Sequence, residues 1–223
     1  MKYDYGQWWL VALNFFLFLV FIKASFKPQN KIDWRSLQML MAFIAALFIE
    51  MYGFPLTIFL LTSVFGNRLG IDFSHDSGHL LNSLLGIKGD PHFNFLHILS
   101  NVLIFGGIIL LGKAWKVLYN SAQKQTLATT GPYAYVRHPQ YLAFILIIIG
   151  FLLQWPTIIT LLMAPILIGR YIWLAEKEEK DITTEFPDKY QKYKASVPEF
   201  YPSPTRLLAR LKDVFNQILS KKF

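Results

Sequence analysis

The 223-residue chain has no cysteine and few charged residues, with 16% of positions charged against 54% hydrophobic. Without cysteine the chain cannot form a disulfide, a thiolate metal site or a cysteine nucleophile. A soluble domain of this length needs more charge, whereas a bilayer accepts apolar surface and requires only that backbone groups be paired internally. The composition therefore predicts an all-α, polytopic membrane protein.

The apolar residues fall in runs that predict about five transmembrane helices, since about 20 residues cross a bilayer. These runs cover residues 8–22, 37–65, 95–118, 139–154 and 157–174. The second run is longer than a bilayer is thick and contains Pro55, where we expect a kink. Trp155 and Pro156 alone separate the last two runs, which predicts an antiparallel helical hairpin. Gly106 and Gly107 in the third run would let another helix approach closely.

Basic residues give the chain a net charge of +8, and they lie between the apolar runs and in the C-terminal tail. Basic residues in these places indicate contact with a membrane surface and not binding of nucleic acid. The excess of lysine and arginine in 23–35 and 113–137 places these connections in the cytoplasm. We therefore expect an extracytoplasmic N-terminus, a cytoplasmic C-terminus, the lipid bilayer as a partner, and no nucleic acid or obligate protein partner.

The segment TTGPYAYVRHPQY, residues 129–141, introduces the predicted hairpin. Proline fits the first position of a helix, so Pro139 marks its start and holds His138 in an extended conformation. Taken alone, Arg137 and His138 could simply anchor this helix at the lipid headgroups.

Two further elements follow in order, a glutamate pair and then a segment of aromatic residues. The three elements are Gly131, Tyr133, Arg137, His138, Pro139 and Tyr141; Glu178 and Glu179; and Phe186, Tyr190, Tyr193, Val197 and Pro198. Together they resemble the isoprenylcysteine carboxyl methyltransferase (ICMT) family of integral membrane methyltransferases. The resemblance covers roughly residues 95 to 202.

We expect three parts in the chain, and the resemblance accounts only for the middle one. Residues 1–94 would form N-terminal membrane helices and an extracytoplasmic loop, and residues 95–205 a methyltransferase-like core with a cytoplasmic cap. Residues 206–223 repeat apolar positions at helical spacing among basic ones, which predicts an amphipathic helix on the inner leaflet.

The resemblance also implies S-adenosylmethionine as the methyl donor, and a small or lipophilic acceptor reached from the bilayer. Carried over by position, the donor site would be lined by Gln125, Thr126, Leu127, Ala128, Tyr133, Arg137, His138, Pro139, Tyr141 and Glu178. The chain has no G-x-G-x-x-G motif, so it lacks the nucleotide-binding turn of Rossmann-type folds.

The residue types suit this donor. Tyrosine rings and Glu178 can face its cationic groups, while Arg137 and His138 can meet its carboxylate. Methyl transfer requires no side-chain nucleophile, so the catalytic residues stay unassigned, with positioning by Arg137 and Glu178 expected. Tyr171 shares a helical face with Glu178 and is a candidate on the substrate side. Glu176 and Glu179 are expected at the surface.

Two positions depart from the family pattern. Leu174 stands where the family has an arginine thought to meet the carboxylate of a prenylated substrate, and Arg170, one turn earlier, could substitute for it. Pro187 stands where the family has a glycine, which alters the turn. We therefore expect an acceptor other than a prenylcysteine carboxylate.

Other functions remain open. Sterol reductases, which use NADPH, also carry an R-H-P-x-Y segment. A metal-binding protein is also possible, because His75 and His79 have the i, i+4 spacing that can share a metal, with Asp76, Asp90 and His92 nearby. No metal is expected in the donor site. Glu50 lies within the second apolar run, where it would stay protonated, pair with a basic residue or line a substrate path.

Overall fold

The structure, a computed structural model, describes residues 5–25, 31–69, 81–82, 85–87 and 93–201. Most of these residues are helical and none lies in a strand, which confirms the all-α prediction. The α-helices are α1 (Trp8–Ser25), α2 (Lys31–Phe48), α3 (Leu56–Leu69), α5 (Phe95–Gln123), α6 (Pro139–Gln154), α7 (Ile158–Glu185) and α8 (Pro187–Ser196). A π-helical turn, η1 (Ile49–Gly53), and a 3-10 turn, η4 (Gly131–Ala134), complete the described helices. The predicted amphipathic helix at 206–223 lies outside the described residues.

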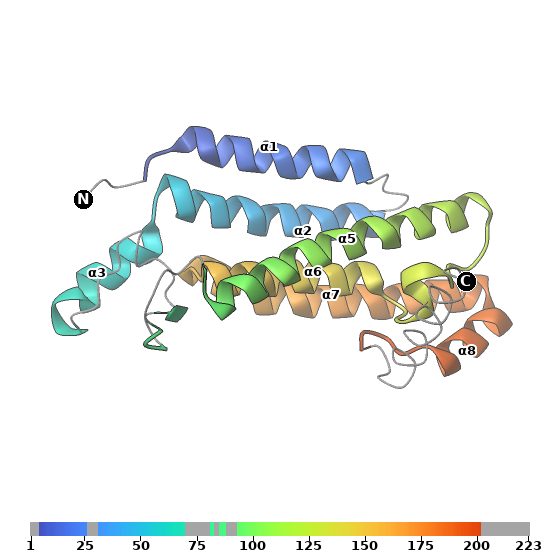
Figure 1. Ribbon diagram of the computed structural model, residues 1–223. Helices are drawn as coiled ribbons and strands as arrows, with labels where there is room; N and C mark the ends of the chain where they lie inside the picture. The colour runs from blue at the N-terminus through green and yellow to red at the C-terminus, as the bar shows by residue number, and fades with distance from the viewer. Residues whose placement is uncertain (1–4, 26–30, 70–80, 83–84, 88–92, 202–223) are drawn as a thin grey trace, which may run out of the picture.

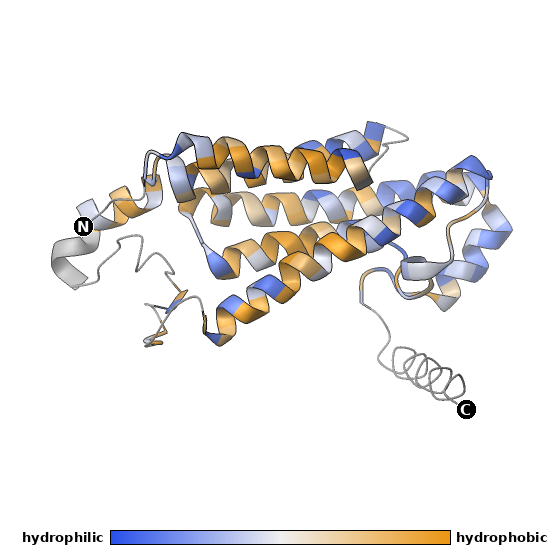
Figure 2. Ribbon diagram, turned by 45° about the horizontal axis from the view of Figure 1, so that its top comes forward, coloured by the Kyte–Doolittle hydropathy of each residue, from blue (hydrophilic) through white to orange (hydrophobic). Residues whose placement is uncertain are grey.

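Three helical stretches, Lys31–Gly53, Phe95–Gln123 and Ile158–Glu185, are long and apolar enough to cross a membrane. The apolar helices α1 and α6 are shorter. Hydrophobic residues cover the middle of the helices, whereas hydrophilic residues gather at the end that carries α8 (Figure 2). These features indicate an integral, multi-pass membrane protein. The side of the membrane on which each terminus lies stays a prediction.

Helices α1, α2, α5, α6 and α7 lie lengthwise beside one another, with α5 against α6 and α2 against α7, whereas α3 and α8 lie at opposite ends of this bundle (Figure 1). Their buried residues form one hydrophobic core, to which α2 contributes Phe43 and Leu47, and α6 contributes Phe144. Residues of the expected N-terminal part, 1–94, and of the methyltransferase-like part, 95–205, therefore pack together in one core.

The predicted hairpin of α6 and α7 is confirmed. Helix α6 ends at Gln154, and Thr157 caps α7 by accepting a hydrogen bond from the backbone N–H of Thr160. The Thr160 hydroxyl in turn accepts from the Thr157 N–H, so both residues satisfy donors at the start of the helix.

The second apolar run breaks into two helices at the expected place. Helix α2 passes into η1, Phe54 is extended, and α3 begins directly after Pro55. The two carboxylate oxygens of Glu50 accept hydrogen bonds from the N–H and the hydroxyl of Thr57, at 3.0 and 3.2 Å. The Thr57 hydroxyl also accepts a bond from the Ile158 N–H. Glu50 thus caps α3, and Thr57 connects α3 to α7. Helix α3 lies at the end of the bundle opposite α8 (Figure 1).

Helices α5 and α6 approach closely at two glycines. A Cβ atom on Gly107 would lie 2.8 Å from the Ile147 side chain and 3.0 Å from the Ala143 carbonyl oxygen. A Cβ atom on Gly150 would lie 2.6 Å from Ile104. The predicted close approach is confirmed for Gly107. It is wrong for Gly106, which faces open space because it points about 100° away around the helix.

Gly107→Ala should destabilise the protein by about 1–3 kcal/mol, because the added methyl group forces two packed backbones apart. Gly106→Ala is the matched control and should be neutral or slightly stabilising, since alanine favours a helix over glycine. Thermal unfolding in detergent measures both. Equal unfolding temperatures for the two variants would contradict the packing described.

Candidate functional site

The chain before α6 pairs with the chain after α8. The N–H of Arg137 donates to the Pro198 carbonyl at 2.9 Å, and the N–H of His138 donates to the Glu199 carbonyl at 3.2 Å. Pro139 occupies the first turn of α6, as predicted. The first and third motif elements therefore lie together.

Helix α8 forms a small cap on these segments. Tyr190, Tyr193 and Val197 form a buried cluster, and the Tyr193 hydroxyl donates to the Tyr133 carbonyl at 2.6 Å. Pro187 begins the helix, a position where its missing N–H costs nothing. Proline in place of the family's glycine therefore serves to start α8.

Glu179 joins three segments through its carboxylate. One oxygen accepts from Arg137 Nε at 2.7 Å and lies 3.2 Å from His138 Nε2, while the other accepts from Lys194 Nζ at 2.6 Å. The prediction that Glu179 lies at the surface is wrong, because α8 folds back over this side of α7 and leaves the Glu179 side chain 10% exposed. Glu176 is exposed, as predicted.

Glu178 is held by a different set of partners. Tyr141 donates its hydroxyl to one carboxylate oxygen at 2.7 Å, and Gln140 donates its amide to the other at 3.2 Å. The Gln140 amide oxygen accepts a bond from the Tyr133 hydroxyl. His138 Nδ1 lies 3.6 Å from Glu178. These contacts fix the direction of the Glu178 carboxylate.

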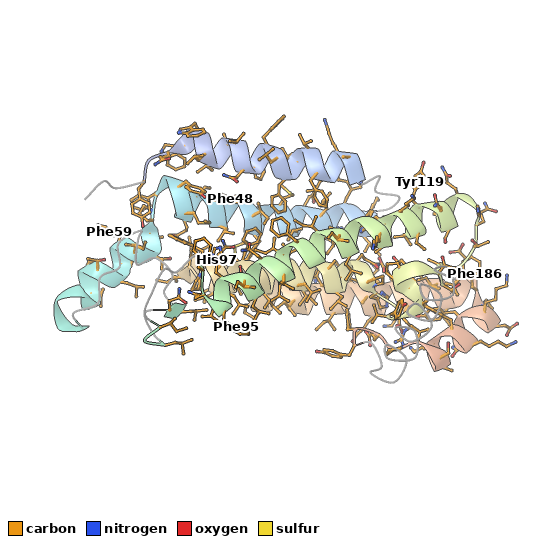
Figure 3. The ribbon with its side chains drawn as sticks, in the orientation of Figure 1. Phe48, Phe59, Phe95, His97, Tyr119 and Phe186 are labelled. Carbon is orange, nitrogen blue, oxygen red and sulfur yellow. The ribbon has the colours of Figure 1, made fainter. Side chains whose placement is uncertain are left out.

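A cavity of about 330 Å³ lies beside these side chains. The start of α2, the end of α5, the following loop, η4, the start of α6 and the end of α7 all contribute to its wall. In Figure 3, Tyr119 and Phe186 mark this end of the bundle, and Phe59 lies at the other. The predicted site residues in the wall are Gln125, Thr126, Leu127, Ala128, Tyr133, Arg137, His138 and Glu178.

The other two predicted donor-site residues do not line the cavity. Pro139 is buried in the first turn of α6. Tyr141 is 1% exposed and lies behind Glu178, with its ring stacked on Tyr171. Tyr141 therefore supports the wall from within the core.

Several residues of the wall were missed by sequence reasoning, namely Asp33, Ser121, Gln140, Asp181, Glu185 and Tyr193. Asp181 and Glu185 follow Glu178 at i+3 and i+7, a spacing that places them on one helical face and that the sequence could have revealed. Nothing in the sequence indicated Asp33, which comes from α2. Four carboxylates thus face the cavity.

Comparison with known proteins agrees with the motifs. Residues 93–184 match the model of the isoprenylcysteine carboxyl methyltransferase (ICMT) family. Over this segment the chain is ICMT-like. The ICMT-like segment contains α5, η4, α6 and nearly all of α7. It therefore includes most of the cavity wall.

One curated relative is the cobalt-zinc-cadmium resistance protein CzcN of Cupriavidus metallidurans, which is 31% identical over 94 residues. The match covers 41% of this chain and 43% of the relative. The chain thus spans under half the length of the curated relative it matches.

The candidates for substrate contact lie away from the cavity. Arg170 is exposed and rests over the Trp173 ring at 4.5 Å. Tyr171 is fully buried, and its hydroxyl donates to the Ser36 carbonyl at 3.1 Å, which ties α7 to α2. Neither residue is brought to the cavity wall.

The His75 and His79 pair lies outside the described residues. Among the described residues, His138, Glu179 and Glu199 place possible metal-ligand atoms within 4.8 Å of one another. Arg137 contacts both glutamates, and Lys194 pairs with Glu179. Side-chain cations therefore already neutralise this cluster.

His138 lies between two carboxylates. Burial lowers the pKa of its imidazole, but hydrogen bonding and charge interactions with Glu178 and Glu179 outweigh burial, so the net pKa rises above the usual 6.5. The charged imidazolium is thus favoured in the folded protein.

Glu179→Gln should destabilise the protein by about 2–4 kcal/mol, because three cationic groups lose a buried counter-charge. The exposed Glu176→Gln, three residues earlier on the same helix, should change stability by under about 0.5 kcal/mol. Chemical unfolding in detergent, followed by tryptophan fluorescence, measures both. An equal and small effect of the two variants would contradict the role assigned to Glu179.

His138 should also make stability depend on pH. Because its pKa is raised on folding, its stabilisation is full below about pH 6.5 and is lost as pH rises through the folded-state pKa. The difference in unfolding temperature between wild type and His138→Gln should therefore shrink from pH 6 to pH 9. A difference that stays constant over this range would contradict the titration of His138 between pH 6 and pH 9.

Proposed function

We propose that the chain is an integral membrane methyltransferase that binds S-adenosylmethionine in the cavity beside Glu178. The observation that carries the proposal is the fixed Glu178 carboxylate, held toward an acidic cavity at the junction of the three motif elements. This junction lies largely within the ICMT-like segment.

The charge of the cavity suits this donor. S-adenosylmethionine carries a sulfonium, an ammonium and a carboxylate, and so has a net positive charge. The wall holds four carboxylates, those of Asp33, Glu178, Asp181 and Glu185, against Arg137 and His138. Arg137 is already paired with Glu179, so the cavity favours a cation.

The shape and lining also suit the donor. A volume of about 330 Å³ lies within the range of small-molecule sites. Leu118, Leu127, Ile182 and Phe186 supply apolar wall for the adenosine. Tyr133 is 4% exposed and presents an aromatic side chain to the same space, which can face a cation.

The reaction moves a methyl group and leaves a thioether. The bound donor supplies a methyl carbon whose bond to sulfur breaks with its electron pair on sulfur, while a lone pair of the acceptor atom forms the new bond and any proton on that atom leaves. Glu178 would orient the cationic part of the donor, and Gln140 and Tyr141 would keep that carboxylate in place. Positioning and exclusion of water would supply most of the rate.

The acceptor should be a small or lipophilic molecule that has no carboxylate needing a side-chain cation at the site. Leu174 is buried in the core, and Arg170 lies over Trp173 outside the cavity. Neither position therefore offers a cation for the carboxylate of a prenylcysteine.

The alternatives fit the cavity less well. The phosphate groups of NADPH would lie against the carboxylates of the cavity wall, and like charges repel. Binding such a dianionic phosphate favours unpaired arginines, whereas Arg137 in this wall is already paired with Glu179. The name of CzcN refers to cobalt, zinc and cadmium resistance, but the His138 cluster of this chain already contains two side-chain cations.

Purified protein in nanodiscs should bind S-adenosylmethionine in calorimetry, and Glu178→Gln should weaken binding roughly tenfold or more through loss of a charge-assisted contact. Glu176→Gln is the matched control on the same helix and should leave affinity unchanged. NADPH should produce no binding heat. Absence of donor binding by the wild-type chain would overturn the proposed function.

A further inference from the structure

One exposed stripe of α7 changes from apolar to cationic along its length. Leu162 and Ile166 are each 66% exposed. The same stripe continues through Arg170, Trp173 and Lys177 at spacings of three or four residues, and all three are exposed. Exposed leucine and isoleucine suit the hydrocarbon of a bilayer, whereas tryptophan and basic residues suit its interface with water. The membrane surface therefore crosses α7 near Trp173.

The length of the hairpin agrees with this position. Helix α6 has 16 residues, and α7, which runs back beside it, reaches Trp173 after the same number of residues. A helix of this length spans about 24 Å, so Trp173 lies level with the start of α6. Arg137 and His138, directly before α6, belong to the cavity wall. The stripe and the cavity are therefore at the same end of the bundle.

Both cations of the stripe contact the same indole ring. The guanidinium carbon of Arg170 lies 4.5 Å from the centre of the Trp173 ring, and Lys177 Nζ lies 5.6 Å from it. These distances are short enough for cation–π contacts, which restrain both long side chains. Within the described part of the chain, neither cation forms an ion pair with a carboxylate. An anion that contacts both groups would therefore be stabilised.

We infer that Arg170, Trp173 and Lys177 form a binding site for the headgroup of an anionic phospholipid. The occupant is a lipid because the stripe continues directly into Leu162 and Ile166, against which the acyl chains of the same molecule would lie. Its phosphate suits the two cations, since a guanidinium can bind two phosphate oxygens and an ammonium acts as a further point charge. The headgroup has a net negative charge because a cationic choline would be repelled by the two side chains.

The site concerns a surface outside the cavity, so the inference does not depend on the proposed function. Lys177 directly precedes Glu178, which points about 100° away around the helix and lines the cavity. A headgroup bound by Lys177 would therefore fix the height of this part of α7, and of the cavity wall that it carries, relative to the membrane surface.

Native mass spectrometry of the full chain, released from mixed micelles of phosphatidylglycerol and phosphatidylcholine, tests the site by measuring the affinity for each lipid. The wild type should bind phosphatidylglycerol more tightly. Arg170→Gln and Lys177→Gln should each weaken phosphatidylglycerol binding roughly fivefold, the effect of one basic residue at an anionic membrane surface, and leave phosphatidylcholine binding unchanged. Trp173→Leu should weaken phosphatidylglycerol binding about twofold to fivefold, because the ring no longer restrains the two cations.

Lys189→Gln is the matched control. It removes one positive charge from an exposed position of α8, outside the stripe, and should leave both lipid affinities unchanged. An equal loss of phosphatidylglycerol binding in Lys189→Gln, or no loss in Trp173→Leu, would indicate diffuse attraction to a basic protein and overturn the inference. Equal affinity of the wild type for the two lipids would overturn it as well.

Inorganic phosphate distinguishes a lipid site from a site for a soluble anion. Phosphate added at the concentration of the lipid should not displace phosphatidylglycerol, and displacement would overturn the inference. The variants should keep the wild-type unfolding temperature in phosphatidylcholine micelles, because the three side chains are exposed. Should Arg170→Gln unfold, Arg170→Lys provides a second variant that keeps the charge and loses the planar group, and its phosphatidylglycerol binding should fall between wild type and Lys177→Gln.

Discussion

The buried carboxylate of Glu179 is the interaction on which the site depends. A carboxylate removed from water must be neutralised, and here the neutralising groups come from Arg137, His138 and Lys194. Arg137 and His138 immediately precede α6, Glu179 lies near the end of α7, and Lys194 belongs to α8. One charge therefore draws three segments of the chain together and holds the cap against the bundle.

Glu178 and Glu179 are adjacent in sequence, but they have different surroundings. Successive residues of a helix point about 100° apart, so only one of the two can face the cap and the other turns toward the cavity. Glu179 is paired with several cations inside the protein, whereas Glu178 accepts hydrogen bonds from the neutral donors Gln140 and Tyr141 and has His138 at 3.6 Å. The charge of Glu178 is thus compensated less than that of Glu179, and Glu178 lines the cavity.

Buried polar side chains gather at the two ends of the helical bundle, and each end has its own set. Glu50 caps α3 and contacts Thr57 at one end, while the cavity and its carboxylates lie at the other. Between these ends, α5 and α6 are held at short distance by Gly107 and Gly150, which fixes the entry to α6 relative to the end of α5. The position of the cavity wall therefore depends on backbone packing deep in the bundle.

The sequence by itself determined the features that depend on local pattern. Apolar runs specified the helices, Trp155 and Pro156 specified the hairpin, and Pro139 specified the start of α6, since each follows from neighbouring residues. The three motif elements also indicated most of the residues that line the cavity.

Only the tertiary structure decided which way each side chain points and what covers it. Glu179 became buried because α8 folds back over it and brings Lys194, 15 residues further along, to its carboxylate, and Tyr141 turned behind Glu178 instead of into the cavity. Asp33 entered the wall through the packing of α2 against α7, more than a hundred residues away. Such contacts depend on how helices rotate and pack against one another, which no local spacing encodes.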